Sequence, residues 1–350
     1  METGLSERKW LRNIKTLAIA AAGAVVFLLL GLPLPLLLGP LFACLIAALA
    51  GAQLADMGSF GVFMRTFLGV AVGSSVTLEV VAVFPSYLYT LLIIPVFIVV
   101  IGLVGYPIFR GLFKMDHPTA YYSSMPGGLQ DMLIFGEEAG GDVRAMSLIH
   151  ATRVLVIVTL APLMIQLLWQ VDLTRPPGQP AMGMTILEIA TMIAAGLAGW
   201  KIAKRIGLFG ASIIGPMILT AMLSLGGVIT QRPPAEIIWA AQYFIAIQIG
   251  VKYVGVTGRE LRLYVGAGVL FSLALGLISL VFIEAISLFD LAEPLDAFLS
   301  FLPGGQGEMV VIAIIAGADL AFVVSHHLLR MILVIALAPL VAALWSGARN

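Results

Sequence analysis

Long apolar runs separated by short polar loops make up most of the chain. A helix needs roughly 17 to 25 apolar residues to cross a bilayer, and most of the runs have about that length. We therefore predict spanning helices at 16–31, 35–51, 63–82, 87–110, 145–169, 185–200, 208–226, 235–255, 261–287 and 321–346. The pattern is typical of an all-α, polytopic membrane protein with ten crossings.

Two stretches, 124–141 and 301–318, interrupt this pattern. Each contains Pro-Gly-Gly, at 126–128 and 303–305, and both are too rich in glycine and charge for an ordinary spanning helix. Lipid cannot satisfy free backbone N–H and C=O groups, so such segments must be shielded by protein or face a water-filled cavity. We interpret both as re-entrant or broken segments. The alternative is a helix break covered by loops at the membrane surface.

The two stretches align without a gap at an offset of 177 residues. Histidine, arginine and aspartate are scarce in this chain, so composition does not explain their coincidence. We infer a duplication, with repeat 1 at 1–170, a Pro-rich linker at 171–183 and repeat 2 at 184–350. Asp131 falls on Glu308, and the identical pairs are Pro126 and Pro303, Gly127 and Gly304, Gly128 and Gly305, Met132 and Met309, Gly140 and Gly317, Asp142 and Asp319, His150 and His327, Arg153 and Arg330, and Pro162 and Pro339.

Basic residues indicate how the repeats are oriented. They precede the first helix of repeat 1, at 8–15, but follow the first helix of repeat 2, at 201–205. Lys and Arg favour the cytoplasmic side of a membrane, so the two repeats are predicted to be inverted. Inversion requires an odd number of crossings, which means about five spanning helices plus one re-entrant or broken segment in each repeat. Both termini would then be cytoplasmic, in the inner (plasma) membrane.

Composition excludes several classes of protein. Hydrophobic residues make up 61% of the chain and charged residues 11%, whereas soluble domains carry about 25% charged residues. The net charge is zero and no long basic tract occurs, so no nucleic-acid partner is expected. One cysteine and four histidines predict neither a disulfide framework nor a metal centre. The expected partners are the lipid bilayer and a small-molecule solute, with a second copy of the chain as a further candidate.

The candidate chemistry lies in the two aligned stretches. Asp131 and Glu308 follow the glycines and could hold H⁺ or Na⁺ in a cavity, but at the interface they would only be solvated. His150 with Arg153 is an i,i+3 pair on one helix face, and its equivalent in repeat 2 matches it. An arginine near mid-membrane costs about 3 kcal/mol or more unless it is paired or hydrated. These pairs could coordinate an anion or relay protons, or form structural ion pairs with the two carboxylates.

Other polar residues have simpler explanations. Asp142 and Asp319 each follow a glycine region and precede an apolar helix, which predicts helix N-caps that accept backbone N–H bonds. His326 falls on Ile149, so it has no counterpart in repeat 1.

The pattern Pro-Gly-Gly-x-x-(Asp/Glu)-Met, Gly-x-Asp, His-x-x-Arg and Ala-Pro resembles the membrane AbrB family, over nearly the whole chain. Asp131 stands where glutamate is more usual in that family. The family carries two labels, ammonia monooxygenase and regulation of gene expression. Four histidines are too few for an oxygenase copper or iron site here, and no DNA-reading module is present. The resemblance therefore implies an indirect effect on gene expression at most.

The leading hypothesis is a secondary transporter of a small polar or anionic solute, coupled to H⁺ or Na⁺, without enzymatic activity or cofactor. The alternative is a membrane sensor or regulator that binds a solute without moving it. In either case the predicted substrate- or ion-binding residues are Pro126, Gly127, Gly128, Asp131, His150, Arg153, Pro303, Gly304, Gly305, Glu308, His327 and Arg330.

Overall fold

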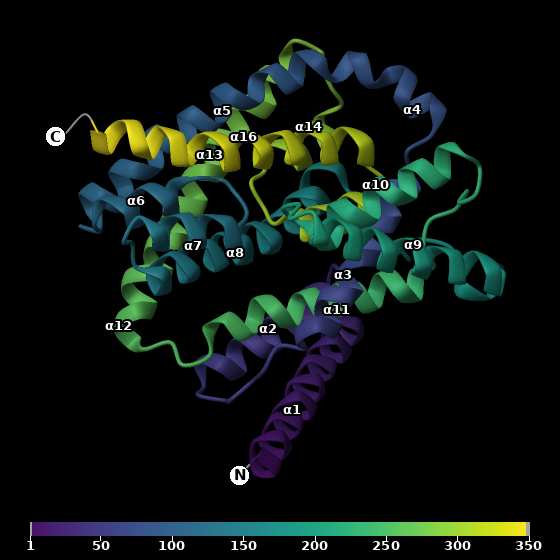
Figure 1. Cartoon of the computed structure of the whole chain (residues 1–350), viewed down its shortest axis with the longest axis horizontal. Coiled ribbons are helices and arrows are strands. Elements are labelled where there is room, and N and C mark those ends of the chain that lie inside the picture. The colour runs from purple at the N-terminus through teal and green to yellow at the C-terminus, as the bar shows by residue number, and fades with distance from the viewer. Residues whose placement is uncertain (1, 348–350) are drawn as a thin grey trace. The chain divides into compact units, whose positions relative to one another are not determined.

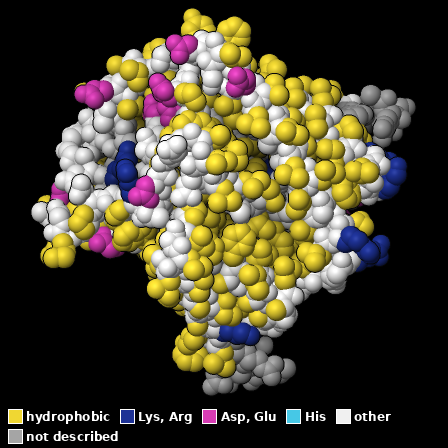
Figure 2. Space-filling model, turned by 180° about the vertical axis from the view of Figure 1, so that it is seen from behind, with side chains coloured by type: hydrophobic (Ala, Val, Ile, Leu, Met, Phe, Trp, Pro, Cys, Tyr) yellow, Lys and Arg dark blue, Asp and Glu magenta, His cyan; other side chains and the backbone are white. Residues whose placement is uncertain are grey.

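The computed structural model describes residues 2–347, and helices are the only regular secondary structure in that range (Figure 1). Large hydrophobic side chains are exposed along most of these helices. The face drawn in Figure 2 shows them as a broad apolar surface with few charged groups. Because water would not wet such a surface, a bilayer is its natural solvent. The predicted all-α, polytopic membrane fold is confirmed.

The chain forms two compact units. Unit 1 contains Met1–Ala82, Pro162–Val256 and Gly307–Ala321, and unit 2 contains Val83–Ala161, Thr257–Gln306 and Phe322–Asn350. Each unit combines segments from both halves of the sequence. The predicted linker at 171–183 lies within unit 1, so the compact units are not the two predicted repeats.

Unit 1 is built from paired helices. α1 packs on α2 and α9 on α10, while α3 packs against α10, and α11 against α2 and α3. The unit also holds most of α4, the end of α8, two 3₁₀ turns and α15. The bounds of its elements are α1 Glu2–Leu29, α2 Pro35–Leu49, α3 Gly58–Gly73, α4 Leu78–Val83, η3 Ala181–Gly183, α9 Ile186–Arg205, α10 Ala211–Leu225, α11 Ala235–Gly250, η4 Val251–Tyr253 and α15 Gln306–Ala316.

Glycines set the close helix crossings in unit 1. Gly23 of α1 meets Gly39 of α2 so closely that a methyl group on either would collide with the other's backbone. Gly199 of α9 meets Gly215 of α10 in the same way. Small residues let helix backbones approach where lipid provides no hydrophobic driving force between helices. The two crossings are 176 residues apart in sequence.

The contacts of α3 and α11 are also equivalent. Gly73 of α3 lies against the backbone at Met217 of α10, and Gly250 of α11 lies against the backbone at Leu41 of α2. Each glycine thus packs on the short helix from the other half of the sequence. Gly73 and Gly250 correspond at an offset of 177 residues, and Leu41 and Met217 at an offset of 176.

Unit 2 holds the two His-x-x-Arg helices, α8 and α16. α5 packs against α6 and α13, and α13 packs against α14. The unit includes α8 as far as Ala161 and α16 from Phe322. The bounds of its elements are η1 Phe84–Tyr87, α5 Leu88–Pro107, η2 Ile108–Leu112, α6 His117–Ser124, α7 Leu129–Glu138, α8 Val143–Trp169, α12 Gly258–Glu260, η5 Leu261–Val265, α13 Gly266–Leu288, α14 Pro294–Phe301 and α16 Leu320–Gly347.

The number of long helices is smaller than the ten crossings predicted. Six helical stretches among the described residues are long and apolar enough to span a bilayer: Trp10–Leu29, Leu78–Leu112, Val143–Trp169, Ile186–Arg205, Gly258–Leu288 and Leu320–Leu344. The other four predicted spans form α2, α3, α10 and α11, which have only 15 or 16 residues. They are short because turns end them early; Gly51, for example, adopts a φ of 87° just after α2.

Both Pro-Gly-Gly sequences lie in breaks between short helices. Residues 125–128 separate α6 from α7, and residues 302–305 separate α14 from α15. Met125 and Leu302 are extended, with ψ angles of 131° and 116°. A residue that precedes proline is sterically excluded from the helical region, which explains why both helices stop at the same position.

Candidate functional site

The Arg153 guanidinium binds the first break directly. Its Nη1 donates to the Met125 carbonyl and its Nη2 to the Gly127 carbonyl, each at 3.1 Å. A break in a helix leaves carbonyl groups without partners, and a guanidinium offers several donors in a fixed fork. Arg153 therefore fastens the non-helical backbone at 125–127 to α8.

Arg330 contacts the second break in the same way, but at longer distances. Its Nη2 lies 3.4 Å from the Gly304 carbonyl and 3.3 Å from Nδ1 of His327. Both distances exceed the usual range for N–H···O and N–H···N bonds, so these contacts are weak. Gly304 is the equivalent of Gly127, and both contacts come from the arginine 26 residues further along the chain.

His150 and His327 also hold the backbone ahead of each break. Nε2 of His150 lies 3.1 Å from the Tyr122 carbonyl, and Nε2 of His327 lies 2.9 Å from the Leu299 carbonyl. A carbonyl can only accept, so Nε2 carries the proton in both rings. Nδ1 of His327 is then free to accept from Arg330.

The two arginines keep donors that the described residues do not use. Each is only 3% exposed. Nε of Arg153, and Nε and Nη1 of Arg330, are buried without a hydrogen-bond partner, and so is Nδ1 of His150. Both guanidinium groups lie in unit 2. The interior of this unit therefore carries two positive charges and several free donors.

The expected ion pair between Arg153 and Asp131 is not formed. Among the side chains of unit 2 that the structure describes, no carboxylate lies within ion-pair distance of Arg153 or Arg330. Arg153 instead contacts the carbonyl backbone of its broken segment and not the acid of that segment.

The first break packs against α16. A methyl group on Gly127 would lie 2.9 Å from Cγ1 of Val334, and one on Gly128 would lie 3.5 Å from Met331. The hydroxyl of Tyr121 donates to the Ala338 carbonyl at 2.9 Å. Only glycine fits such a close approach at 127, so the Pro-Gly-Gly of the first half lies beside the helix that carries Arg330.

Asp131 lies one turn into α7, with its carboxylate folded back over Gly128. The side chain is half-buried, and burial raises the pKa of this carboxyl above its usual value. This carboxyl is therefore easier to protonate than that of an exposed aspartate. It lies close to the loop that Arg153 binds.

The predicted site residues fall in both units. Unit 2 contains eleven of the twelve, and unit 1 contains Glu308, which is 5% exposed on α15. Of the two predicted caps, Asp142 lies in unit 2 and Asp319 in unit 1. Asp142 Oδ1 accepts the Ala145 N–H at 3.0 Å, and Asp319 Oδ1 accepts the Ala321 N–H at 2.9 Å. The unit 2 members are Pro126, Gly127, Gly128, Asp131, His150, Arg153, Pro303, Gly304, Gly305, His327 and Arg330.

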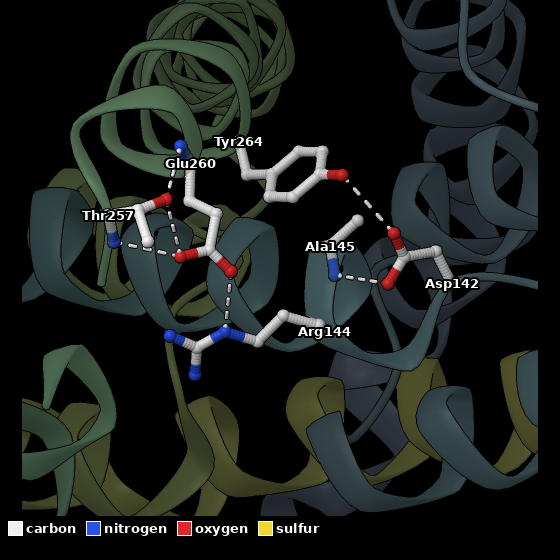
Figure 3. Close-up of polar contacts among 6 residues, drawn as sticks. All are labelled: Asp142, Arg144, Ala145, Thr257, Glu260 and Tyr264. Atoms are coloured by element: carbon white, nitrogen blue, oxygen red, sulfur yellow. Dashed lines mark hydrogen bonds and ion pairs between the residues drawn. The ribbon is translucent and has the colours of Figure 1, made fainter. Parts of the chain in front are cut away.

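A polar cluster at the start of α8 was not foreseen (Figure 3). Tyr264 donates to Asp142 Oδ2 at 3.2 Å, and Arg144 forms an ion pair with Glu260 at 2.9 Å. Glu260 also closes a capping box with Thr257. The Thr-x-x-Glu spacing of that box was visible in the sequence, whereas nothing in the spacing pointed to Arg144 or Tyr264. The cluster joins the start of α8 to the start of α12.

Two known proteins match this chain over most of its length. No solved structure matches the chain. A protein of Bacillus subtilis (strain 168) described as "Uncharacterized protein YhjN" is 26% identical over 356 residues, which cover 94% of this chain and 92% of that protein. The "Putative regulator AbrB" of Escherichia coli (strain K12) is 25% identical over 332 residues, which cover 91% of this chain and 92% of that protein.

A family model covers most of the chain as well. The model for AbrB, described as "Transition state regulatory protein AbrB", matches residues 36–346. That range includes both Pro-Gly-Gly breaks and both His-x-x-Arg helices, so the match extends over the whole of the candidate site. The chain belongs to the AbrB family.

Proposed function

We propose that this membrane protein is a secondary transporter of a small anionic solute. The observation that carries the proposal is the pair of buried arginines, Arg153 and Arg330, which retain free donors and have no carboxylate within ion-pair distance among the described side chains of unit 2. No enzymatic step and no cofactor are part of the proposal.

Electrostatics favours an anion over a neutral or cationic solute. A buried charge is strongly unfavourable unless it is paired and hydrogen-bonded, and unit 2 buries two positive charges. Carbonyl hydrogen bonds solvate part of each guanidinium, but they supply no negative charge. An anion held by Nε and Nη1 of Arg330 and Nε of Arg153 would satisfy the free donors and balance the buried positive charge.

The two halves of the chain are further proposed to be inverted repeats. Equivalent contacts support this: both histidines bind carbonyls 28 residues upstream, and both arginines bind carbonyls 26 residues upstream. The reciprocal glycine contacts in unit 1 support it too. Inverted repeats with discontinuous helices are the arrangement many secondary transporters use for their binding sites. The location would be the plasma membrane, with both termini cytoplasmic.

Flux through reconstituted protein tests the proposal. Full-length protein in proteoliposomes would be given labelled sulfate, phosphate, and mono- and dicarboxylates, with a neutral sugar and a cationic amine as controls. We expect uptake of at least one anion, strongly reduced in Arg153→Gln and Arg330→Gln. Lys252→Gln is the matched control, because it removes an exposed positive charge in unit 1. Full flux in both arginine variants would show that the site is elsewhere.

A sensor without transport is the second candidate, favoured by the regulatory names of the family model and of the Escherichia coli relative. Such a protein would bind an anion at the same arginines but would not move it. Thermal stabilisation by an anion, lost in Arg330→Gln and unaccompanied by any flux, would support the sensor.

A further inference from the structure

A second polar site lies in unit 2, one turn before Arg330. His326 is fully buried in α16. Its Nδ1 lies 2.7 Å from the Phe322 carbonyl, and its Nε2 lies 2.9 Å from Oγ1 of Thr90 on α5. The Thr90 hydroxyl lies 2.9 Å from the Tyr87 carbonyl as well.

These contacts suit two protonation states without moving any heavy atom. In both, Nδ1 donates to the Phe322 carbonyl, which can only accept. With a neutral ring, the Thr90 hydroxyl donates to Nε2. With a protonated ring, Nε2–H donates to Oγ1, and the hydroxyl turns to donate to the Tyr87 carbonyl. Each state is fully hydrogen-bonded, so a proton can bind and leave by rotation of a single hydroxyl.

The other two buried histidines do not have this freedom. His327 uses Nε2–H on a carbonyl and Nδ1 as the acceptor for Arg330. Protonation of Nδ1 would break that contact and set a second positive charge against the guanidinium. His150 makes the equivalent carbonyl bond, and no acceptor among the described residues lies at its Nδ1.

The equivalent position in the first half is apolar. His326 corresponds to Ile149, and Thr90 corresponds to Ala267. Both equivalents are fully buried, and α8 packs against α13 there, since a methyl group on Gly268 would lie 3.1 Å from the Ile149 carbonyl. The fold can therefore build this helix crossing without a polar pair. Packing alone does not require His326 and Thr90.

We propose that His326, with Thr90, is a proton-binding site that couples proton movement to the anion; this rests on the proposed function. Positions four apart share a helix face, so His326 and Arg330 are near neighbours. An anion on Arg330 would favour a proton on His326, and by linkage the proton would favour the anion. Among the described residues of unit 2, the Phe301 ring of α14 and the Thr90 hydroxyl of α5 contact His326. The further ionisable neighbours in this unit are His327, next along α16, and Tyr87 of η1, whose ring packs on Phe322 beside the imidazole.

Nitrogen NMR of the full-length protein in lipid bilayers, with ¹⁵N-labelled histidine, tests the proton site without needing a known solute. The four histidines give few signals, and the His326 signal is the one that His326→Gln removes. We expect it to change from one neutral form to imidazolium as the pH falls from about 8 to about 4. A single neutral form throughout this range would overturn the proposal.

Two sets of variants distinguish a specific effect on the titration of His326 from a loss of folding. Thr90→Val removes the hydroxyl that accepts from protonated Nε2, so the His326 midpoint should fall by about one pH unit; Thr90→Ser should leave it unchanged. Equal midpoints in Val and Ser variants would contradict the assigned role of Thr90. The double variant H326I/T90A copies the pair already packed in the first half, and should keep the wild-type unfolding temperature.

Coupling is tested separately, with whichever labelled anion the proteoliposome panel identifies. H326I/T90A should still carry that anion down its concentration gradient but should no longer respond to an imposed pH gradient. An unchanged response would overturn the coupling. If no anion moves at all while His326 titrates, the transport proposal fails and the proton site stands.

Discussion

At the scale of single residues, the two arginines differ in how firmly the structure holds them. Arg153 makes two carbonyl hydrogen bonds at 3.1 Å, whereas the contacts of Arg330 are 3.3 and 3.4 Å long. A hydrogen bond to a charged group contributes about 1.5–3 kcal/mol. Arg153→Met should therefore lower the free energy of unfolding by about 2 kcal/mol or more.

Arg330→Met should be close to neutral for stability, because it loses only weak contacts and removes a buried charge that has no carboxylate partner in unit 2. Both variants should lose anion binding. Thermal unfolding in detergent, with and without sulfate, measures both effects. Equal destabilisation by the two substitutions would contradict the different roles inferred from the distances.

The Asp131 carboxyl should give the protein a pH dependence. Its pKa is raised by burial, so the folded state favours the protonated form. That contribution to stability is present below the unfolded-state pKa and is lost as pH rises through the folded-state pKa. Relative to wild type, Asp131→Asn should therefore gain stability as pH rises. Unfolding temperatures from about pH 4 to pH 8 would show this, with the exposed Glu137→Gln on the same helix as the control.

At the scale of elements, replacing a glycine by alanine should destabilise the fold where two helices cross closely, and not where the added methyl group meets open space. Gly39→Ala and Gly215→Ala each place a methyl group against a neighbouring backbone, at equivalent crossings of α1 with α2 and α9 with α10. Both should destabilise the fold strongly and to a similar extent. Gly276 of α13 has nothing within 4 Å of an added methyl group. Gly276→Ala should be neutral, or stabilising by up to about 1 kcal/mol, in the same unfolding assay.

The cluster in Figure 3 predicts that two of its substitutions lower the free energy of unfolding by different amounts. Asp142→Ala removes the cap of α8 and the acceptor of Tyr264, and should cost about 1–2 kcal/mol. Arg144→Ala removes an exposed ion pair and should cost less than about 1 kcal/mol. Measured free energies in the reverse order would show that the ion pair, and not the cap, secures the start of α8.

The apolar pattern predicted which segments are helices better than it predicted how long each helix is or which groups its side chains contact. Apolar runs identify helices because lipid requires every backbone group to be satisfied within the segment. They do not show where a helix stops: the run at 35–51 includes residues that turn at Gly51. Helix periodicity placed His150 and Arg153 on one face, but it could not show that carbonyls of the break, and not Asp131, would meet them. Partner choice depends on tertiary packing.

At the scale of the whole molecule, the proposed inversion makes a prediction about which loops face the cytoplasm. Basic residues at 8–15 and 201–205 should lie inside, which places the linker at Pro177 and the turn at Gly227 outside. Single cysteines at Pro177, Gly227 and Arg205 can be introduced into a Cys44→Ala background, since Cys44 is the only native cysteine. In intact cells a membrane-impermeant thiol reagent should label the first two positions, while Arg205→Cys should react only after the membrane is opened. Labelling of all three from outside would exclude the inverted arrangement. That result would also remove the symmetry argument by which Arg153 and Arg330 belong to one site.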